Sequence, residues 1–226
     1  MKLSIVEIFL LLAHHPSKGR FIIAPMQINY GIIGAILLEM SLEDKIGIDN
    51  DILTLKNNEA TDNQIVSEIR VIISSSKKTR KIKYWIAKLV RKSSKYMWAI
   101  LSELANKNFI SIEYKKFLGF IPYKKTYLID NKTREILIEQ LKNNMLLNQE
   151  LSNESVIMLG LIEACKMHSI FTQDKKELKI IKAKLKQVIK ESPIANSLDQ
   201  TIKQVQAAIL GAVIGASVAA SASGSH

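Results

Sequence analysis

The segment at residues 115–125 constrains the fold most, because it places an apolar, aromatic run between two pairs of lysines. Its flanks, residues 109–114 and 126–129, are rich in β-branched and aromatic side chains, which is typical of paired strands. Gly119 and Pro122 interrupt the run between these flanks, so the sequence predicts a β-hairpin. Its apolar tip comprises Phe117, Leu118, Phe120, Ile121 and Tyr123, and its basic collar comprises Lys115, Lys116, Lys124 and Lys125.

A hairpin of this composition has three explanations, because an exposed apolar patch usually marks a contact surface. On a membrane, the apolar tip enters the acyl region while the ammonium groups of the basic collar stay near anionic head groups, each contributing about 1 kcal/mol. Alternatively, the tip packs into the protein's own core, or it binds another protein, including a second copy of the chain. The sequence favours membrane contact and leaves the other two explanations open.

The remainder of the chain is dominated by segments with the apolar periodicity of helices. Helices are expected over residues 4–13, 27–42, 64–73, 78–91, 95–106, 131–145, 153–167, 175–190 and 198–220. A short strand is expected at residues 21–23, and a second, smaller hairpin at residues 45–55. We therefore predict a mainly α fold: a single-domain helical bundle over residues 1–220 with two small β-hairpins, one of which has an apolar, membrane-facing tip. Residues 221–226 are expected to be a frayed tail.

Composition narrows the class of partner. The net charge of +11 and the pI of about 9.6 favour a polyanion, which leaves nucleic acid, an anionic membrane or an acidic protein. The single Cys165 rules out an internal disulfide and a cysteine metal cluster. It lies in an apolar segment, so we interpret it as an inert buried thiol.

No segment is expected to cross a membrane. Glu7 interrupts the apolar run at residues 3–13, and no small-residue cleavage site follows, unlike in a signal peptide. The most apolar stretch, residues 207–220, would extend about 21 Å as a helix, whereas a hydrocarbon core is about 30 Å thick. We therefore expect a cytoplasmic protein that associates with membranes peripherally.

A second basic cluster lies on the expected helix at residues 78–91 and just beyond it. Four of its members, Lys88, Arg91, Lys92 and Lys95, are spaced three or four residues apart and could share one helix face. Together with the basic collar they would form one surface for anionic head groups; the alternative is an ordinary solvated face. Trp85 and Trp98 lie among these cations, and we favour core packing over interfacial anchoring for both.

No catalytic motif is recognisable in the sequence. His14 and His15 are adjacent, so they point in different directions on a helix, and no third ligand is spaced nearby for a metal ion. Glu39 and Glu103 occupy matching places in two helix–hairpin segments, and we expect them to hold local hydrogen bonds instead of transferring protons. We predict that the protein is not an enzyme and uses no metal or cofactor.

Three segments, residues 3–12, 30–46 and 101–110, resemble in order and spacing the Golgi phosphoprotein 3 family, which also has bacterial members. The resemblance covers nearly the whole chain. It implies a mostly helical single domain with a central bundle and small hairpins. It also implies a peripheral membrane protein that binds phosphatidylinositol 4-phosphate and inserts an apolar hairpin, which here corresponds to residues 117–123.

The family's head-group pocket is not retained in this sequence. The Golgi members use a tryptophan and three arginines, which align with Ala24, Ile33, Ser94 and Met97. None of these side chains can bind a phosphate by charge, so we predict binding to anionic phospholipids in general, with little preference for phosphatidylinositol 4-phosphate.

Two further functions remain as alternatives. A helix followed by a hairpin, twice over, resembles a winged-helix nucleic-acid-binding protein, but a DNA-reading wing would be polar and basic at its tip. A protein-only adaptor that self-associates through the hairpin into a homo-oligomer is the other alternative.

Overall fold

The computed structural model describes residues 2–56, 61–147, 151–191 and 203–211, and these are mostly helical with two small antiparallel hairpins, which confirms the predicted fold class. The helices are α1 (Ile5–Ala13), α2 (Pro25–Leu42), α3 (Gln64–Ser74), α4 (Ile82–Leu89), α5 (Ser93–Asn106), α6 (Lys132–Leu146), α7 (Asn153–Ala164) and α8 (Lys175–Glu191). Short 3₁₀ turns, η1 (Val90–Lys92) and η2 (His168–Ile170), follow α4 and α7. Residues 203–211 are also helical.

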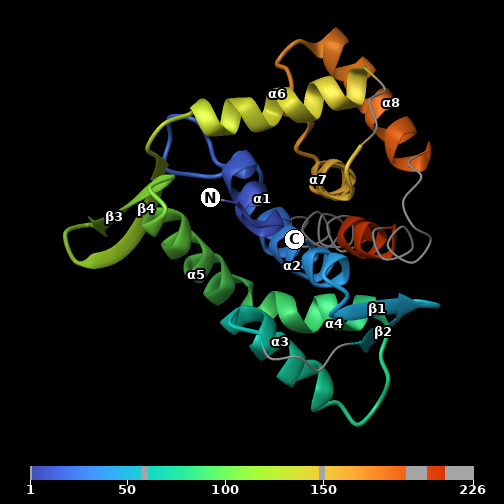
Figure 1. Ribbon diagram of the computed structural model, residues 1–226. Coiled ribbons are helices and arrows are strands. Elements are labelled where there is room, and N and C mark those ends of the chain that lie inside the picture. Colours follow the sequence, from blue (N-terminus) through green and yellow to red (C-terminus); the bar gives the residue numbers. More distant parts are fainter. Residues whose placement is uncertain (1, 57–60, 148–150, 192–202, 212–226) are drawn as a thin grey trace, which may run out of the picture.

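Helices α1 and α2 form the centre of the molecule, with α4 and α5 on one side and α6 and α7 on the other (Figure 1). Helix α1 begins at a capping box, in which Ser4 Oγ accepts from the Glu7 amide at 3.3 Å and Glu7 Oε2 accepts from the Ser4 amide at 2.9 Å. Helix α2 is apolar on all sides and is therefore surrounded by other helices. A Cβ at Gly31 would lie 2.2 Å from Phe9 Cζ, so this glycine is required for the close approach of α1 and α2.

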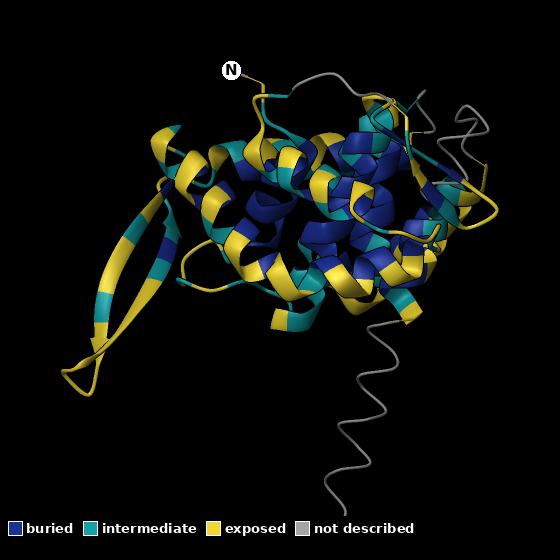
Figure 2. Cartoon of the chain, turned by 90° about the horizontal axis from the view of Figure 1, so that it is seen from below, coloured by how far each residue is buried: buried dark blue, intermediate teal, exposed yellow. Residues whose placement is uncertain are grey.

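The two hairpins differ in length and in placement. Strands β1 (Ile46–Asp49) and β2 (Ile52–Leu55) pair antiparallel beside α4, whereas β3 (Ile110–Phe117) and β4 (Ile121–Leu128) form a longer ribbon. This ribbon leaves the helical body near the end of α5 and projects away from it (Figures 1 and 2). Its pairing runs from Ile110–Leu128 at the base to Phe117–Ile121 at the outer end.

One predicted helix start and one predicted strand were wrong. The helix expected at residues 78–91 begins only at Ile82, because the preceding backbone pairs with the first hairpin: the Leu53 amide donates to the Arg80 carbonyl, and Lys81 forms a bridge with Ile52. The strand expected at residues 21–23 is wrong, because Phe21 makes only an isolated bridge with His14.

Two other boundaries also moved. The helix expected at residues 153–167 ends at Ala164, since Lys166 adopts a left-handed φ of 56° and the Met167 amide donates back to the Ile162 carbonyl. The strands of the long hairpin extend further than predicted and include the basic collar. The first residues of the helix expected at 198–220 and most of the apolar stretch at residues 207–220 lie outside the described residues. Within the described part of the chain, no helix is both long enough and apolar enough to span a bilayer.

Candidate functional site: the long hairpin and the cavity at its base

The apolar tip of the long hairpin lies in solvent. The turn is closed by Leu118 and Gly119, with φ angles of 51° and 80°, and the Phe120 amide donates to the Phe117 carbonyl at 3.3 Å. The exposed fractions are 58% for Phe117, 70% for Leu118, 71% for Phe120, 46% for Ile121 and 38% for Tyr123. Packing of this tip into the protein's own core is therefore wrong, and the predicted exposure is confirmed. The exposed Tyr114, on the outward part of β3, extends the apolar surface and was missed by the sequence reasoning.

Two lysines of the basic collar, both on β4, lie close to aromatic rings. Lys124 Nζ lies 5.3 Å from the ring centre of Trp98 on α5 and 5.2 Å from that of Tyr114. Lys125 Nζ lies 6.0 Å from the ring centre of Tyr123. Each ring stabilises a nearby ammonium group without neutralising it.

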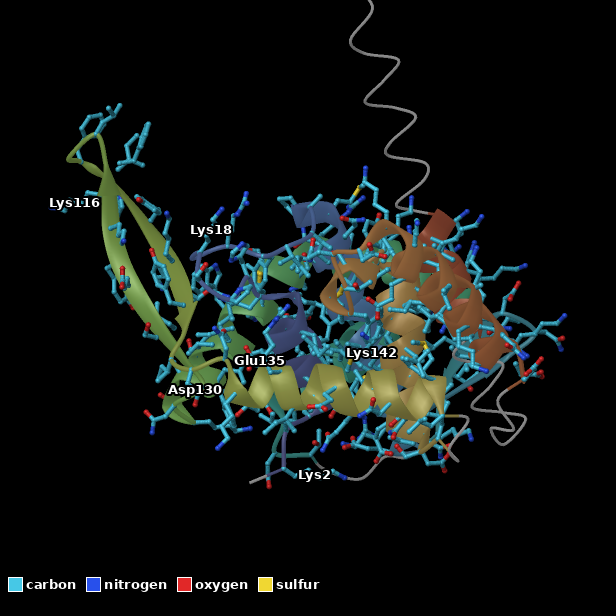
Figure 3. The ribbon with its side chains drawn as sticks, turned by 90° about the horizontal axis from the view of Figure 1, so that it is seen from above. Lys2, Lys18, Lys116, Asp130, Glu135 and Lys142 are labelled. Atoms are coloured by element: carbon cyan, nitrogen blue, oxygen red, sulfur yellow. The ribbon has the colours of Figure 1, made fainter. Side chains whose placement is uncertain are left out.

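Lys115 and Lys116 differ within the same collar. Lys115 Nζ contacts Glu113 Oε2 at 2.9 Å and the Tyr127 hydroxyl at 3.1 Å, and these hydrogen bonds, first that to Glu113, raise the pKa of Lys115. Lys116 is exposed and lies far out on the hairpin, away from the helical body (Figure 3). Lys115 therefore stays protonated, but Glu113 compensates its charge, so the net positive charge of the collar lies chiefly at the other three lysines.

The second predicted basic group is largely occupied by contacts within the protein. Lys92 Nζ and Lys95 Nζ both pair with Glu68 of α3, at 2.9 and 2.6 Å. Lys88 Nζ lies 5.2 Å from the Trp85 ring centre, and Arg91 is exposed on η1. The structure therefore brings Lys92 and Lys95 together at a carboxylate, while the collar contacts a different part of α5 at Trp98. The role of Lys88, Arg91, Lys92 and Lys95 as head-group contacts stays a prediction.

The two tryptophans differ in burial. Trp85 is 1% exposed and packs in the core, as predicted. Trp98 is half-buried against the core with Lys124 over its ring.

A cavity of about 910 Å³ lies at the base of the hairpin. The loop between α1 and α2, the first turn of α2, α5, β4, the first turn of α6 and η2 all contribute to its wall. One part of the wall is apolar and includes Phe21, Ile22, Ile23, Pro25, Met97 and Leu101. The other part is polar and basic and includes His15, Arg20, Lys124, Lys125, Thr126 and Arg134. Lys18, on the same loop between α1 and α2, lies between the hairpin and the helical body (Figure 3).

The four positions aligned with the family's head-group pocket do not all meet at this cavity. Ala24 and Met97 line it, whereas Ile33 is fully buried in the core and Ser94 is exposed on α5. Lys124 and Lys125 of the basic collar line it as well, whereas two further cations in its wall, Arg20 and Arg134, were missed by the sequence reasoning. Each is isolated in the sequence, so no motif or spacing could have indicated that the fold brings them to one cavity.

The polar wall is held by a hydrogen-bonded histidine. His14 is 1% exposed; its Nδ1 lies 3.2 Å from the His15 carbonyl oxygen and its Nε2 lies 2.9 Å from Thr126 Oγ1. Because a carbonyl can only accept, Nδ1–H donates to it, and the neutral ring then accepts from the Thr126 hydroxyl at Nε2. Burial lowers the pKa of His14, and nearby Arg134 lowers it further, which favours this neutral form.

A separate carboxylate cluster lies at the start of α1. Glu39 Oε1 accepts from the Ile5 amide at 3.1 Å, so this acid holds a hydrogen bond as predicted, but with a residue distant in the sequence instead of a local one. Burial raises the pKa of Glu39 to about 7, and the charges of Glu43 and Glu7 add to this effect. Glu7 is 2% exposed and pairs with Lys107 at 2.5 Å. Glu7, Glu39 and Glu103 all line one small cavity of about 140 Å³.

Cys165 and the side chains that could bind a metal ion are the remaining reactive groups. Cys165 is buried, and burial raises the pKa of its thiol to about 12, in line with the inert thiol predicted. Among the described residues, no three His, Cys, Asp or Glu side chains are grouped so that they could hold a metal ion.

Fold and site together define a mainly helical protein with a projecting, apolar-tipped hairpin beside a basic-walled cavity. A family model described as Golgi phosphoprotein 3 (GPP34) matches residues 5–205, so the chain belongs to this family, which has lipid-associated roles. The resemblance predicted from three sequence segments is thereby confirmed. A comparison with curated proteins gave no match.

Proposed function

We propose that this protein is a peripheral membrane protein that binds anionic bilayers by inserting the apolar tip of its long hairpin. The observation that carries the proposal is the exposure of the tip, where Phe117, Leu118 and Phe120 are each more than half exposed. Contiguous exposed apolar side chains at the end of a projecting ribbon are costly in water and favourable in a lipid interface.

The magnitudes explain why the tip alone would bind weakly. Full burial of four large apolar side chains contributes at most roughly 6–12 kcal/mol, at about 1.5–3 kcal/mol each. Association costs an estimated 4–15 kcal/mol in lost translational and rotational freedom. The balance is close to zero, so a second favourable contribution is needed.

The basic collar supplies that contribution and makes binding dependent on lipid charge. Among the described residues, no ion pair involves Lys116, Lys124 or Lys125, whereas Lys115 pairs with Glu113. Each uncompensated lysine near an anionic leaflet contributes about 1 kcal/mol, and the attraction falls off within a Debye length. The altered positions Ala24 and Met97 leave no reason for a preference for phosphatidylinositol 4-phosphate over other anionic lipids at matched charge.

Liposome co-sedimentation tests the proposal. The wild-type chain should pellet with vesicles that contain phosphatidylserine, and to a similar extent with phosphatidylinositol 4-phosphate vesicles of matched charge, but poorly with neutral vesicles. The double variant Phe117→Ser, Phe120→Ser should remain in the supernatant with an unchanged melting temperature. The matched control is Val71→Ser, Ile180→Ser, which removes two apolar side chains that are 63% and 64% exposed but lie outside the hairpin.

The outcomes also separate the alternatives. If the tip variant still pellets but its sedimentation coefficient falls, the tip mediates self-association and the proposal is wrong. If duplex DNA competes with vesicles for the wild-type chain at equal charge concentration, the basic surface is not selective for lipid. We also propose that the protein binds lipid without catalysing a reaction. Mass spectrometry of the lipids recovered from the co-sedimentation experiment should then show them chemically unchanged.

A further inference from the structure

A buried arginine without a carboxylate partner lies in the wall of the large cavity. Arg134 is in the first turn of α6 and is 8% exposed. For its five N–H donors, the described residues supply one acceptor, the Leu12 carbonyl oxygen at 3.1 Å from Nη2. Nε has no hydrogen-bond partner. Buried charges in proteins are normally paired, so this guanidinium has the features of an anion receptor that the protein itself leaves unfilled.

The surroundings of Arg134 add positive charge and no compensating carboxylate. Arg20 and Lys125 line the same cavity, and the buried His14 nearby is neutral in the hydrogen-bonded form described above. The adjacent Glu135 attracts Arg134 electrostatically, but it is exposed and forms no ion pair with it within the described residues. The contact between Arg134 and the Leu12 carbonyl fixes the guanidinium in place before any ligand arrives.

The same cavity also has an apolar wall, to which Phe21, Ile23, Met97 and Leu101 contribute. Its volume of about 910 Å³ falls within the usual range of roughly 300–1,000 Å³ for small-molecule sites. A free inorganic anion would satisfy Arg134 but leave this wall in water. A purely apolar ligand would cover the wall but leave the buried guanidinium without a counter-charge.

We propose that this cavity binds a single-chain anionic amphiphile, with its carboxylate or phosphate head on Arg134 and its alkyl chain along the apolar wall. The head group receives charge-assisted hydrogen bonds from the guanidinium, while Arg20 and Lys125 attract it electrostatically. The site is distinct from the apolar tip and takes a ligand molecule from solution, so it goes beyond the proposed membrane docking and does not depend on it.

Calorimetric titration of the full chain, with each ligand below its critical micelle concentration, tests the chemistry. The probes are dodecyl phosphate, laurate, dodecyl maltoside and inorganic phosphate. Both anionic amphiphiles should bind at least tenfold more tightly than the neutral maltoside, which has the same alkyl chain as dodecyl phosphate and one methylene more than laurate. They should also bind at least tenfold more tightly than inorganic phosphate, which has the head without the chain. The ratio between dodecyl phosphate and laurate then identifies the preferred head.

Two variants locate the ligand by independent routes. Arg134→Gln removes the receptor, and Met97→Glu places a negative charge in the cavity without touching the contact between Arg134 and Leu12. Both should weaken binding of the anionic amphiphiles at least tenfold. Arg80→Gln is the matched control, because Arg80 also has an unpartnered Nε but stacks on Tyr84 at 4.7 Å, outside the cavity. Arg80→Gln should bind the anionic amphiphiles as tightly as the wild type does. The melting temperature of Met97→Glu should be unchanged, which would show that its loss of binding is not caused by misfolding.

The results also separate this site from the hairpin. The tip variant Phe117→Ser, Phe120→Ser should keep amphiphile binding while it loses vesicle binding, and Met97→Glu should do the reverse. Equal affinity for the maltoside and the anionic amphiphiles, or wild-type affinity in a folded Met97→Glu variant, would overturn the proposal.

Discussion

The two hairpins of this protein use apolar residues in opposite ways. In the short β1–β2 hairpin, Ile46, Ile48 and Leu53 are each 5% exposed or less, and the turn carries only polar residues. In the long β3–β4 hairpin only the base is buried, at Ile110 and Thr126, and the apolar side chains of the turn lie in solvent. Figure 2 shows the long hairpin as a mostly exposed or half-buried ribbon that projects from a helical body with a buried interior. A β-hairpin thus contributes to the core in one place and presents exposed apolar side chains in the other.

The largest effect is expected from the long hairpin on membrane binding. The change Phe117→Ser, Phe120→Ser should reduce vesicle affinity by about 3–6 kcal/mol if both rings are fully buried in lipid. Co-sedimentation over a range of lipid concentrations measures this loss. The corresponding truncation in the short hairpin should leave vesicle affinity unchanged as long as the protein is folded.

For the free energy of unfolding, the short hairpin should matter more than the long one. Leu53→Ala in the short hairpin should lower the free energy of unfolding by about 2–5 kcal/mol, as truncation of buried leucines does. Phe120→Ala in the long hairpin should change it by less than about 0.5 kcal/mol, because the ring is 71% exposed. Urea denaturation of both variants measures the difference. A larger loss for Phe120→Ala than for Leu53→Ala would mean that the tip packs on protein.

A smaller effect is expected from the basic collar. Replacement of Lys116 and Lys124 by Gln should weaken binding to anionic vesicles by about 1 kcal/mol per charge at low salt. The deficit should shrink as salt is added, because screening already suppresses the wild-type attraction. Lys115→Gln should have the least effect of the collar changes, since Glu113 already compensates its charge. Equal effects at low and high salt would contradict an electrostatic role.

A pH effect should fall on the helical body and spare the tip. The pKa of Glu39 is raised from 4.5 to about 7 in the folded state, so folding favours its protonated form. This stability is fully present below the unfolded pKa and is lost as pH rises through the folded pKa. Glu39→Gln keeps an acceptor for the Ile5 amide but cannot ionise.

The melting temperature of Glu39→Gln relative to the wild type should therefore increase as pH is raised from about 4.5 to about 7 and then level off. The neighbouring charges, Glu7, Glu43 and Lys45, are present in both proteins and largely cancel in the comparison. Parallel pH profiles for the two proteins would show that Glu39 is not the group responsible. Vesicle binding should be the same for both proteins across this range.

Local patterns predicted much of the fold. The apolar periodicity of the helices and the composition of both hairpins act over short distances, and most helices and both hairpins lie close to where they were expected. The exposure of the apolar tip was favoured by the sequence but not fixed by it, because an apolar turn between lysines is compatible with packing on protein as well as with membrane contact.

Long-range contacts explain what the sequence did not predict. Helix α4 starts late because Arg80 and Lys81 use their backbone to pair with the short hairpin. The strands β3 and β4 run through the lysine pairs because cross-strand neighbours such as Glu113–Lys125 and Tyr114–Lys124 support the ladder. The cavity is assembled from separate segments, so neither its basic wall nor the buried Arg134 could be derived from local spacing.

The most direct test of the central claim measures the depth of the apolar tip in a bilayer. Cys165 is buried and the pKa of its thiol is raised to about 12, so it should stay unlabelled while a cysteine introduced at Leu118 reacts with an environment-sensitive fluorophore. A label introduced at Asp49, at the turn of the short hairpin, is the matched control. With anionic vesicles that contain acyl-brominated lipids, we predict a blue shift and quenching at position 118 and neither at position 49. Binding without quenching at position 118 would contradict insertion of the tip.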